Sequence, residues 1–302
     1  YLLIYRHLGL DEMNKDSTFS NYLELTKPGV QALLFVSCIS GMLIASNFNP
    51  PLLTFFFGLT GVSLLAASAA VVNHIYDASI DSKMSRTSNR PIVTGSINKK
   101  SATIFAIGLY LIGSFFLLAF TNTLTWLMTT ITFVFYAFIY TMYLKQLTSQ
   151  NIVIGGVAGS MPPLLGWTAI TNNLDPNAWL LVLIILVWTP PHFWALAIKR
   201  VEEYKEAEVP MLPVHKGVPF TKLHILLYTL LLIVASLLPF TTGLFGITYL
   251  VSALLLGFIF LYLSLRLYME EGDTFAMPTF FYSLWYLAAL FGFMLIDVFF
   301  QL

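Results

Sequence analysis

The stretch Asn73-His-Ile-Tyr-Asp77-Ala-Ser-Ile-Asp81 ends one of the long apolar runs of this chain. Asn73, Asp77 and Asp81 are four residues apart, so they share one face of an α-helix. Hard oxygen ligands on one face suit Mg²⁺, which takes one or two carboxylates together with phosphate oxygens and water. Carboxylates at a helix C-terminus oppose the helix dipole, and polar groups near hydrocarbon are costly. We therefore predict a metal site here rather than an ordinary solvated helix end.

A cluster of cations follows this acidic face. Arginine side chains bind phosphate oxygens through two parallel hydrogen bonds. Basic residues at a membrane surface can also serve only as anchors for anionic lipid, which is how we interpret Lys99 and Lys100. Arg86 and Arg90 come directly after the acidic face. We therefore predict that these two arginines bind a diphosphate or another anionic ligand.

The composition of the chain excludes a soluble enzyme. Of the 302 residues, 58% are hydrophobic and only 10% are charged, whereas a soluble domain has about 25% charged residues. The mean hydropathy is +0.80. The single cysteine, Cys38, lies within an apolar run and offers no disulfide and no metal cluster. We expect membrane lipids, and no nucleic acid, among the partners.

Nine apolar runs are long enough to cross a bilayer as helices, which takes about 20 residues. They lack the alternation of transmembrane strands, and lipid does not tolerate unpaired backbone groups. The predicted fold class is therefore all-α, a polytopic membrane protein with nine transmembrane helices. The runs are Val30–Phe48, Leu52–Val72, Ala102–Phe120, Leu124–Leu144, Ile152–Ile170, Ala178–Ile198, Leu223–Phe240, Leu244–Met269 and Phe275–Phe300.

The distribution of cations predicts the orientation. With nine spans, all fifteen Lys and Arg residues fall on one side of the membrane, which the positive-inside rule makes cytoplasmic. The N-terminus is then inside the cell. We predict a cytoplasmic N-terminal segment over residues 1–28 and a single transmembrane domain over residues 29–302. Its long cytoplasmic loops lie near residues 75–101 and 199–222.

The sixth run ends in Pro190-Pro191-His192, followed by Lys199-Arg200-Val-Glu202-Glu203. The proline pair predicts a break or kink just before His192. An intramembrane histidine could be a haem-iron ligand, a proton carrier or a hydrogen-bonded core residue. Glu202 fits a solvated face better than a ligand set.

Lys145 follows the fourth run, at its cytoplasmic end. It could be a plain interfacial anchor or could neutralise charge on a diphosphate leaving group. The glycines that follow, Gly155, Gly156 and Gly159, favour close helix packing.

Five sequence blocks carry a family resemblance. They are Asn73-x3-Asp77-x3-Asp81-x2-Met84-x-Arg86-Thr87-x2-Arg90-Pro91, Asn151-Ile-Val-Ile-Gly155-Gly156, Pro162-Pro163-Leu-Leu-Gly166-Trp167, Pro191-His192-Phe193-Trp194-Ala195-Leu196-Ala197-Ile198 and Val209-Pro210-Met211-Leu212-Pro213-Val214. Together they resemble the UbiA superfamily of intramembrane prenyltransferases and, within it, the branch that farnesylates protohaem IX. The acidic block alone would indicate only the superfamily, and the later blocks indicate the branch.

The resemblance implies nine helices around a central cavity that the two polar loops cap. It implies transfer of the farnesyl group of farnesyl diphosphate to a vinyl group of haem B. The products would be haem O and diphosphate, in the synthesis of haem A and the cytochrome oxidase cofactor. Ionisation leaves an allylic cation, the vinyl group attacks it, and water captures the new cation as a hydroxyl. Haem A synthase is a candidate partner.

The resemblance also implies roles for individual residues. Mg²⁺, with Mn²⁺ as an alternative, would be held by Asn73, Asp77 and Asp81, which with Lys145 form the predicted catalytic set. His192 is the candidate contact with haem, and Glu202 and Glu203 are the candidate second acidic motif. The predicted diphosphate-binding residues are Arg86, Arg90, Lys145, Lys199 and Arg200.

The chain departs from the family pattern at three places. The superfamily's second Asp-x3-Asp is replaced by glutamates, Glu202 and Glu203. Its Tyr-x3-Lys becomes Tyr140-x4-Lys145, which is one residue longer. Glu208 stands where we expect glycine.

Two other functions compete with this interpretation. One is a UbiA-type enzyme that prenylates an aromatic quinone precursor, against which the Pro-His-Phe-Trp block argues. The other is a membrane transporter or haem-binding chaperone, but the polar groups gather on one side rather than at the midplane. A bacterial plasma membrane is favoured over a mitochondrial inner membrane, because no Arg-rich transit peptide is visible.

Overall fold

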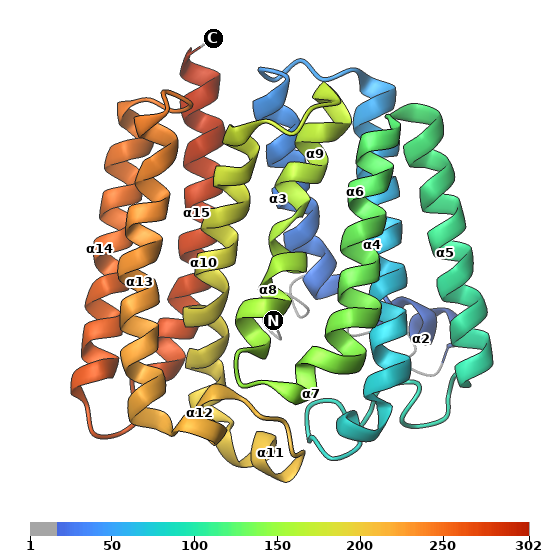
Figure 1. The fold of residues 1–302 in the computed structure, drawn as a ribbon, viewed down its shortest axis with the longest axis vertical. Helices are drawn as coiled ribbons and strands as arrows, with labels where there is room; N and C mark the ends of the chain where they lie inside the picture. Colours follow the sequence, from blue (N-terminus) through green and yellow to red (C-terminus); the bar gives the residue numbers. More distant parts are fainter. Residues whose placement is uncertain (1–16, 302) are drawn as a thin grey trace.

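The computed structural model describes residues 17–301, and in this range it contains helices and no strands. Nine helical segments of this range are long and apolar enough to cross a membrane (Figure 1), which confirms the nine predicted spans. They are α3 (Pro28–Ala45), α4 (Leu52–Asp81), α5 (Lys99–Phe120), α6 (Thr123–Val134) continued by η2 (Phe135–Leu144) and α7 (Lys145–Leu147), α8 (Asn151–Ser160) with α9 (Pro162–Thr171), α10 (Pro176–Lys199), α13 (Val218–Thr241), α14 (Ile247–Met269) and α15 (Ala276–Gln301).

The short helices gather at one end of the bundle, the lower end in Figure 1. They are α7, α11 (Val201–Glu206) and α12 (Leu212–Lys216), while α2 (Thr18–Leu25) lies somewhat higher and packs on α4. The segment between α4 and α5 lies at the same end. This end carries the loops for which the charge distribution predicts a cytoplasmic location.

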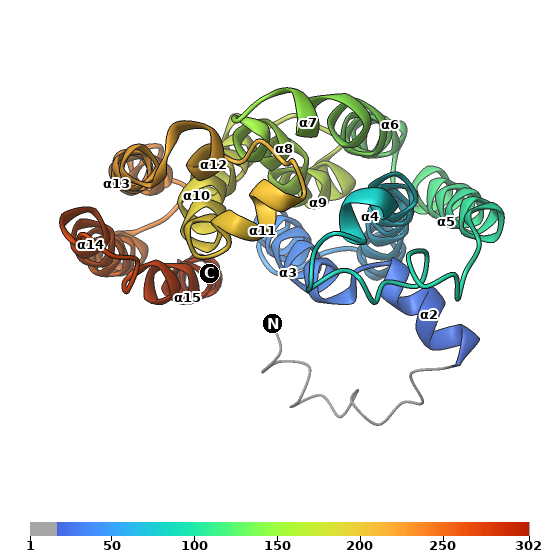
Figure 2. The same cartoon turned by 90° about the horizontal axis from the view of Figure 1, so that it is seen from below.

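The long helices form two groups that meet along α10 (Figure 2). Helices α10, α13, α14 and α15 pack against one another on one side, and α3, α4, α5, α6 and α9 form the other side. Helix α10 also packs on α8 and α9, which joins the groups. The core at this junction is apolar and includes the buried residues Leu164, Leu181, Ile184 and Trp188.

Helix α4 is longer than the apolar pattern predicts. The predicted span ends at Val72, but the helix continues to Asp81. Hydropathy alone misses this extension because its polar side chains are buried inside the bundle, where they find polar partners. The acidic face therefore stands on continuous helix.

Two glycines let α3 and α9 approach closely. A Cβ atom at Gly41 would lie 2.1 Å from the carbonyl oxygen of Pro163, and one at Gly166 would lie 2.2 Å from the carbonyl oxygen of Cys38. Any side chain at either position would collide with backbone. The contact fixes α3, and with it the residue just before α3, relative to the rest of the bundle.

Helix α10 runs through Pro190 and Pro191 without ending. Of the predicted break or kink, the break is therefore absent, and the kink stays a prediction. Membrane helices tolerate proline where neighbouring helices satisfy the freed backbone groups, and this part of α10 is buried against other helices.

Candidate active site

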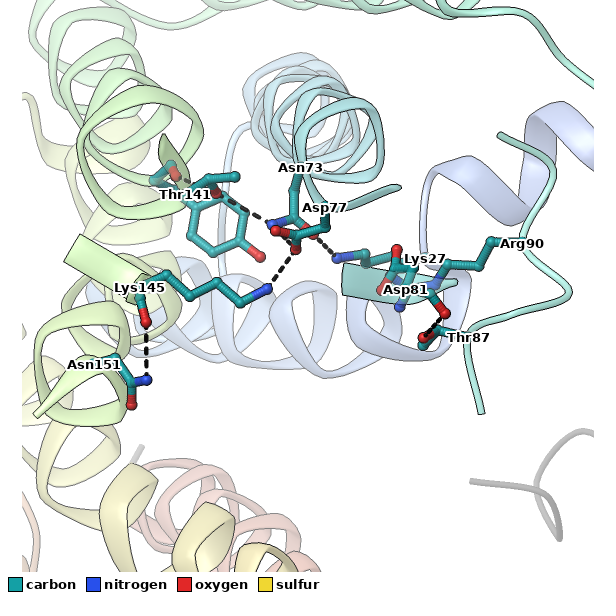
Figure 3. A network of polar contacts seen from close by, with 10 residues as sticks. Lys27, Asn73, Asp77, Asp81, Thr87, Arg90, Thr141, Lys145 and Asn151 are labelled. Carbon is teal, nitrogen blue, oxygen red and sulfur yellow. Dashed lines mark hydrogen bonds and ion pairs between the residues drawn. The ribbon is translucent and has the colours of Figure 1, made fainter. Parts of the chain in front are cut away.

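The acidic face of α4 points into the bundle (Figure 3). Asn73, Asp77 and Asp81 are 3%, 3% and 4% exposed. The Asn73 side-chain amide donates to Asp77 Oδ2 at 2.8 Å and to Thr141 Oγ1 at 3.2 Å. The helical spacing thus brings the three predicted metal ligands to one buried location.

Each of these three residues contacts a cation from another segment. Lys145 Nζ lies 2.6 Å from Asp77 Oδ2, and Arg90 Nη1 lies 2.5 Å from Asp81 Oδ2. The Lys27 ammonium donates to Asn73 Oδ1. The oxygens of the acidic face therefore form a site that attracts positive charge.

These side chains line a cavity of about 170 Å³, which we call the polar pocket. Its lining includes four basic side chains and two carboxylates, so the basic groups outnumber the acidic ones by two. A divalent metal would raise this balance further, which suits an anion with several charges such as a diphosphate. The lining consists of Lys27, Asn73, Asp77, Ile80, Asp81, Met84, Arg86, Arg90, Tyr136, Tyr140, Lys145, Asn151, Ile152, Phe193, Tyr204, Val209 and Met211.

Lys27 is a pocket residue that the sequence reasoning missed. It precedes Pro28, the first residue of α3, and has a φ of 54°. This left-handed conformation is costly for a residue with a Cβ and occurs often at functional sites. Burial lowers the pKa of Lys27 to about 7, and nearby Arg90 lowers it while Asp77 raises it. The available signal was a lysine directly before the proline that begins a membrane helix.

A π-helix brings Tyr140 and Lys145 to the same pocket. Residues Phe135–Leu144 form this π-helix, and the Lys145 N–H donates to the Tyr140 carbonyl, five residues earlier. The additional residue in Tyr140-x4-Lys145 is therefore absorbed by the wider turn, and both side chains line the polar pocket. Single π turns are frequent at functional sites. Gly155 supports this arrangement, because a Cβ there would lie 2.5 Å from the Tyr140 ring.

Asn151 holds the C-terminal end of the π-helix through a hydrogen bond to the backbone of Lys145. Its side-chain amide donates to the Lys145 carbonyl at 3.1 Å, and the residue is 1% exposed. This contact fixes the backbone that carries the Lys145 ammonium. The Asn151 Oδ1 atom is buried, with no hydrogen-bond partner among residues 17–301.

A second cavity, of about 130 Å³, adjoins the polar pocket. We call it the apolar chamber, since most of its lining is hydrocarbon. Lys27 and Tyr136 line both cavities, so the two meet there. The chamber lies between α3, α4, α6, η2, α8 and α9 and is lined further by Val30, Gln31, Leu34, Val62, Ser63, Leu65, Ala66, Ala69, Ala70, Thr129, Thr132, Phe133, Ala158, Gly159, Pro162 and Leu165.

The loops at the pocket mouth are joined to each other. The Ser85 hydroxyl donates to Glu203 Oε2 at 3.3 Å, and Lys83 Nζ lies 3.8 Å from Glu208 Oε1. Tyr204 covers the pocket from α11, and burial raises the pKa of its phenol. Glu208 has a φ of 56°, the conformation that glycine adopts at least cost, which accounts physically for the glycine expected there.

Several predicted residues lie outside the lining of the polar pocket. Lys199 Nζ is 3.2 Å from Asp273, and Arg200 is 3.4 Å from Glu203. Glu203 therefore contacts loop residues, and Glu202 is exposed on α11. The structure does not bring Lys199, Arg200 or the two glutamates to the acidic face.

His192 is packed at the interface of α10 and α15. Its ring lies between those of Trp188 and Phe280, with centroids 4.4 Å and 4.6 Å away. Its Nδ1 atom is 2.6 Å from the Ser283 hydroxyl. His192 is 3% exposed and lines neither cavity. Its contact with haem stays a prediction.

The residues of the acidic face fit a magnesium ion. Residues 17–301 contain no cluster of three or more His, Cys, Asp or Glu side chains that could hold a metal ion by itself. The acidic face offers two carboxylates and one amide. Mg²⁺ ordinarily takes one or two carboxylates and completes its shell with phosphate oxygens and water. The donor set of the acidic face is therefore compatible with Mg²⁺, although protein cations contact its oxygens here.

Comparison with known proteins identifies the family. Residues 34–295 match the model of the UbiA prenyltransferase family. The chain belongs to the UbiA prenyltransferase family. A protoheme IX farnesyltransferase from Alcanivorax borkumensis is 50% identical over 287 residues, covering 94% of this chain and 95% of the relative. One from Legionella pneumophila (strain Lens) is 52% identical over 280 residues, covering 93% and 95%.

Solved structures of the UbiA family have the same fold. A digeranylgeranylglyceryl phosphate synthase matches with a TM-score of 0.79 at 22% identity, covering 93% of this chain and 98% of that one. A UbiA homolog from Archaeoglobus fulgidus, bound to GPP and Mg²⁺, matches with a TM-score of 0.64 at 14% identity, covering 91% and 99%. At these identities the likeness establishes the fold alone.

Proposed function

We propose that this UbiA-family protein transfers the farnesyl group of farnesyl diphosphate to a vinyl group of haem B, giving haem O and diphosphate. One observation carries the proposal: the polar pocket, which contains the acidic face and its basic partners, adjoins the apolar chamber at Lys27 and Tyr136. A molecule with an anionic head and a hydrocarbon tail fits this junction. The haem acceptor is supported by relatives about half identical along nearly their whole length, named protoheme IX farnesyltransferases.

Asn73, Asp77 and Asp81 would hold Mg²⁺, or Mn²⁺ in its place. The UbiA homolog from Archaeoglobus fulgidus that is bound to GPP and Mg²⁺ supports this proposal. The metal, when bound, supplies charge that neutralises the diphosphate. The cations now paired with the acidic face are then available to bind the diphosphate oxygens and to stabilise the charge of the leaving group. We assign this role to Lys27, Arg90 and Lys145, and also to Arg86, which lines the same pocket without contacting the acidic face.

The chamber accounts for the fate of the hydrocarbon. Small and apolar residues such as Ala66, Ala70 and Leu165 line it, and burial of apolar surface there would favour binding by about 25 cal/mol per Å². These walls limit the water that can reach the allylic cation before the vinyl group attacks it.

We propose a bacterial plasma membrane as the location, and haem A synthase as a partner that takes the product.

The test supplies the purified protein with farnesyl diphosphate, Mg²⁺ and either haem B or an aromatic acid, and identifies products by mass. We expect haem O from haem B and no prenylated aromatic acid. An Asp77→Asn variant should lose turnover about 100- to 1,000-fold, the typical effect of removing one preorganised electrostatic group. Asp273→Asn, a change to an exposed carboxylate at the same end of the bundle, is the matched control. Prenylation of the aromatic acid, or full turnover by Asp77→Asn, would refute the proposal.

A further inference from the structure

One residue that lines the apolar chamber, Gln31, has a buried hydrogen-bond acceptor without a donor. The Gln31 Oε1 atom is enclosed and has no hydrogen-bond partner among residues 17–301. Two other polar side chains of the chamber are satisfied within their own helix, since Thr129 donates to the Thr125 carbonyl at 2.7 Å and Thr132 to the Met128 carbonyl at 2.8 Å. A buried polar group without a partner is unfavourable and often marks a functional role.

Gln31 lies close to the border between the two cavities. It lies in the first turn of α3, four residues after Lys27, and its backbone N–H donates to the Lys27 carbonyl at 3.0 Å. Lys27 lines both the polar pocket and the chamber, while Gln31 lines the chamber only. The orphan acceptor is therefore about one helical turn inside the chamber from the residue that marks the border.

The reacting carbon belongs at this border, if the proposed function holds. The diphosphate occupies the polar pocket and the farnesyl chain occupies the chamber, so the carbon that joins them lies between the two. When the terminal vinyl carbon bonds to this carbon, the positive charge appears on the adjacent vinyl carbon. The new cation is thus only two bonds from the border, next to Gln31.

We propose that Gln31 positions the water molecule that captures this cation. The water donates one hydrogen bond to Gln31 Oε1 and presents a lone pair to the cationic carbon. The C–O bond to diphosphate breaks with its electron pair on the diphosphate, and the new C–C bond uses the electrons of the vinyl double bond. Water then forms the C–O bond, and the diphosphate accepts the proton that water loses. No oxidation or reduction occurs.

Without the positioned water, the cation reacts by a different route, the loss of a proton. Without a nucleophile in place, the adjacent carbon loses a proton to the diphosphate and a double bond forms. This product is lighter than the hydroxylated haem by the mass of one water. The ratio of the two products therefore reports on Gln31 independently of the overall rate.

The experiment compares Gln31→Leu, Gln31→Met and Gln31→Glu with the parent protein, using haem B, farnesyl diphosphate and Mg²⁺. The side chains of Gln31→Leu and Gln31→Met are apolar, like most of the residues that line the chamber, so at least one of the two variants is expected to fold. They should lower the ratio of hydroxylated to dehydrated product about tenfold, equal to about 1.4 kcal/mol of activation free energy. Gln31→Glu keeps an acceptor oxygen at this position, so its product ratio should stay close to that of the parent protein. Ser37→Ala is the control, since Ser37 is a polar residue of α3 that donates to the Leu33 carbonyl and lines neither cavity.

An unchanged product ratio in both apolar variants would overturn the proposal, whether or not their rate falls. Farnesyl transfer without hydroxylation would support it. A parent protein that makes no farnesylated haem would instead refute the proposed function, so the two failures are distinguishable.

Discussion

Arg86 is the pocket cation whose removal should weaken diphosphate binding most directly. The other three cations contact the acidic face, whereas Arg86 has no hydrogen bond or ion pair among residues 17–301. A hydrogen bond to a charged group contributes about 1.5–3 kcal/mol. Arg86→Ala should therefore weaken binding about 10- to 150-fold. The measurements are the inhibition constant of inorganic diphosphate with Mg²⁺ and the KM for farnesyl diphosphate.

Two neighbouring substitutions make this prediction specific. Lys83→Ala removes a half-exposed cation of the same loop that lies outside the pocket, and should change KM less than about twofold, because exposed ion pairs contribute about 0–1 kcal/mol. Arg90→Ala leaves buried Asp81 without its partner, so it should also destabilise the fold by about 3–5 kcal/mol. Arg86→Ala should leave Tm unchanged. Equal KM values for Arg86→Ala and Lys83→Ala would refute the assignment.

Three further outcomes are expected. Glu208→Gly should raise the free energy of unfolding by about 1 kcal/mol, because it relieves a left-handed conformation and loses only an exposed ion pair, and a fall in Tm would contradict this. Gly155→Ala should lower kcat about 10- to 100-fold by displacing the Tyr140 ring. Gly108→Ala is the control and should leave kcat unchanged, because a Cβ there meets nothing within 4 Å. Equal kcat values for the two variants would count against the role of Tyr140. Removal of the metal by a chelator should abolish turnover but leave Tm within about 2 °C, since cations of the protein already pair with the acidic face, and a large fall in Tm would show that the metal holds the fold.

The sequence predicts the fold well because lipid imposes simple rules. Each apolar run must be helical to satisfy its backbone, so hydropathy alone locates the nine spans to within a few residues. Hydropathy alone ends the second span at Val72, because the last turns of α4 are polar although neighbouring helices enclose them. The four-residue spacing of Asn73, Asp77 and Asp81 predicts helix here, and the structure confirms it.

The site was predictable where its residues share one helix. Regular spacing placed Asn73, Asp77 and Asp81 together, because four residues make about one turn. Lys27 was missed because its partner is 46 positions away in the sequence. Lys199 was expected in the site, but it lies beside Asp273. No local pattern encodes these long-range contacts.

The π-helix separates two surfaces that an ordinary helix would couple rigidly. Inserting one residue into an α-helix rotates everything beyond it by about 100°. Here the wide turn confines that rotation to residues 135–144, so Thr129 and Thr132 keep their orientation toward the chamber while Lys145 keeps its own toward Asp77. An insertion or deletion within this segment can therefore change the direction in which the Lys145 side chain points without altering the walls of the chamber. Relatives that differ by one residue here should be aligned with a local gap, and residues on either side can evolve as independent units.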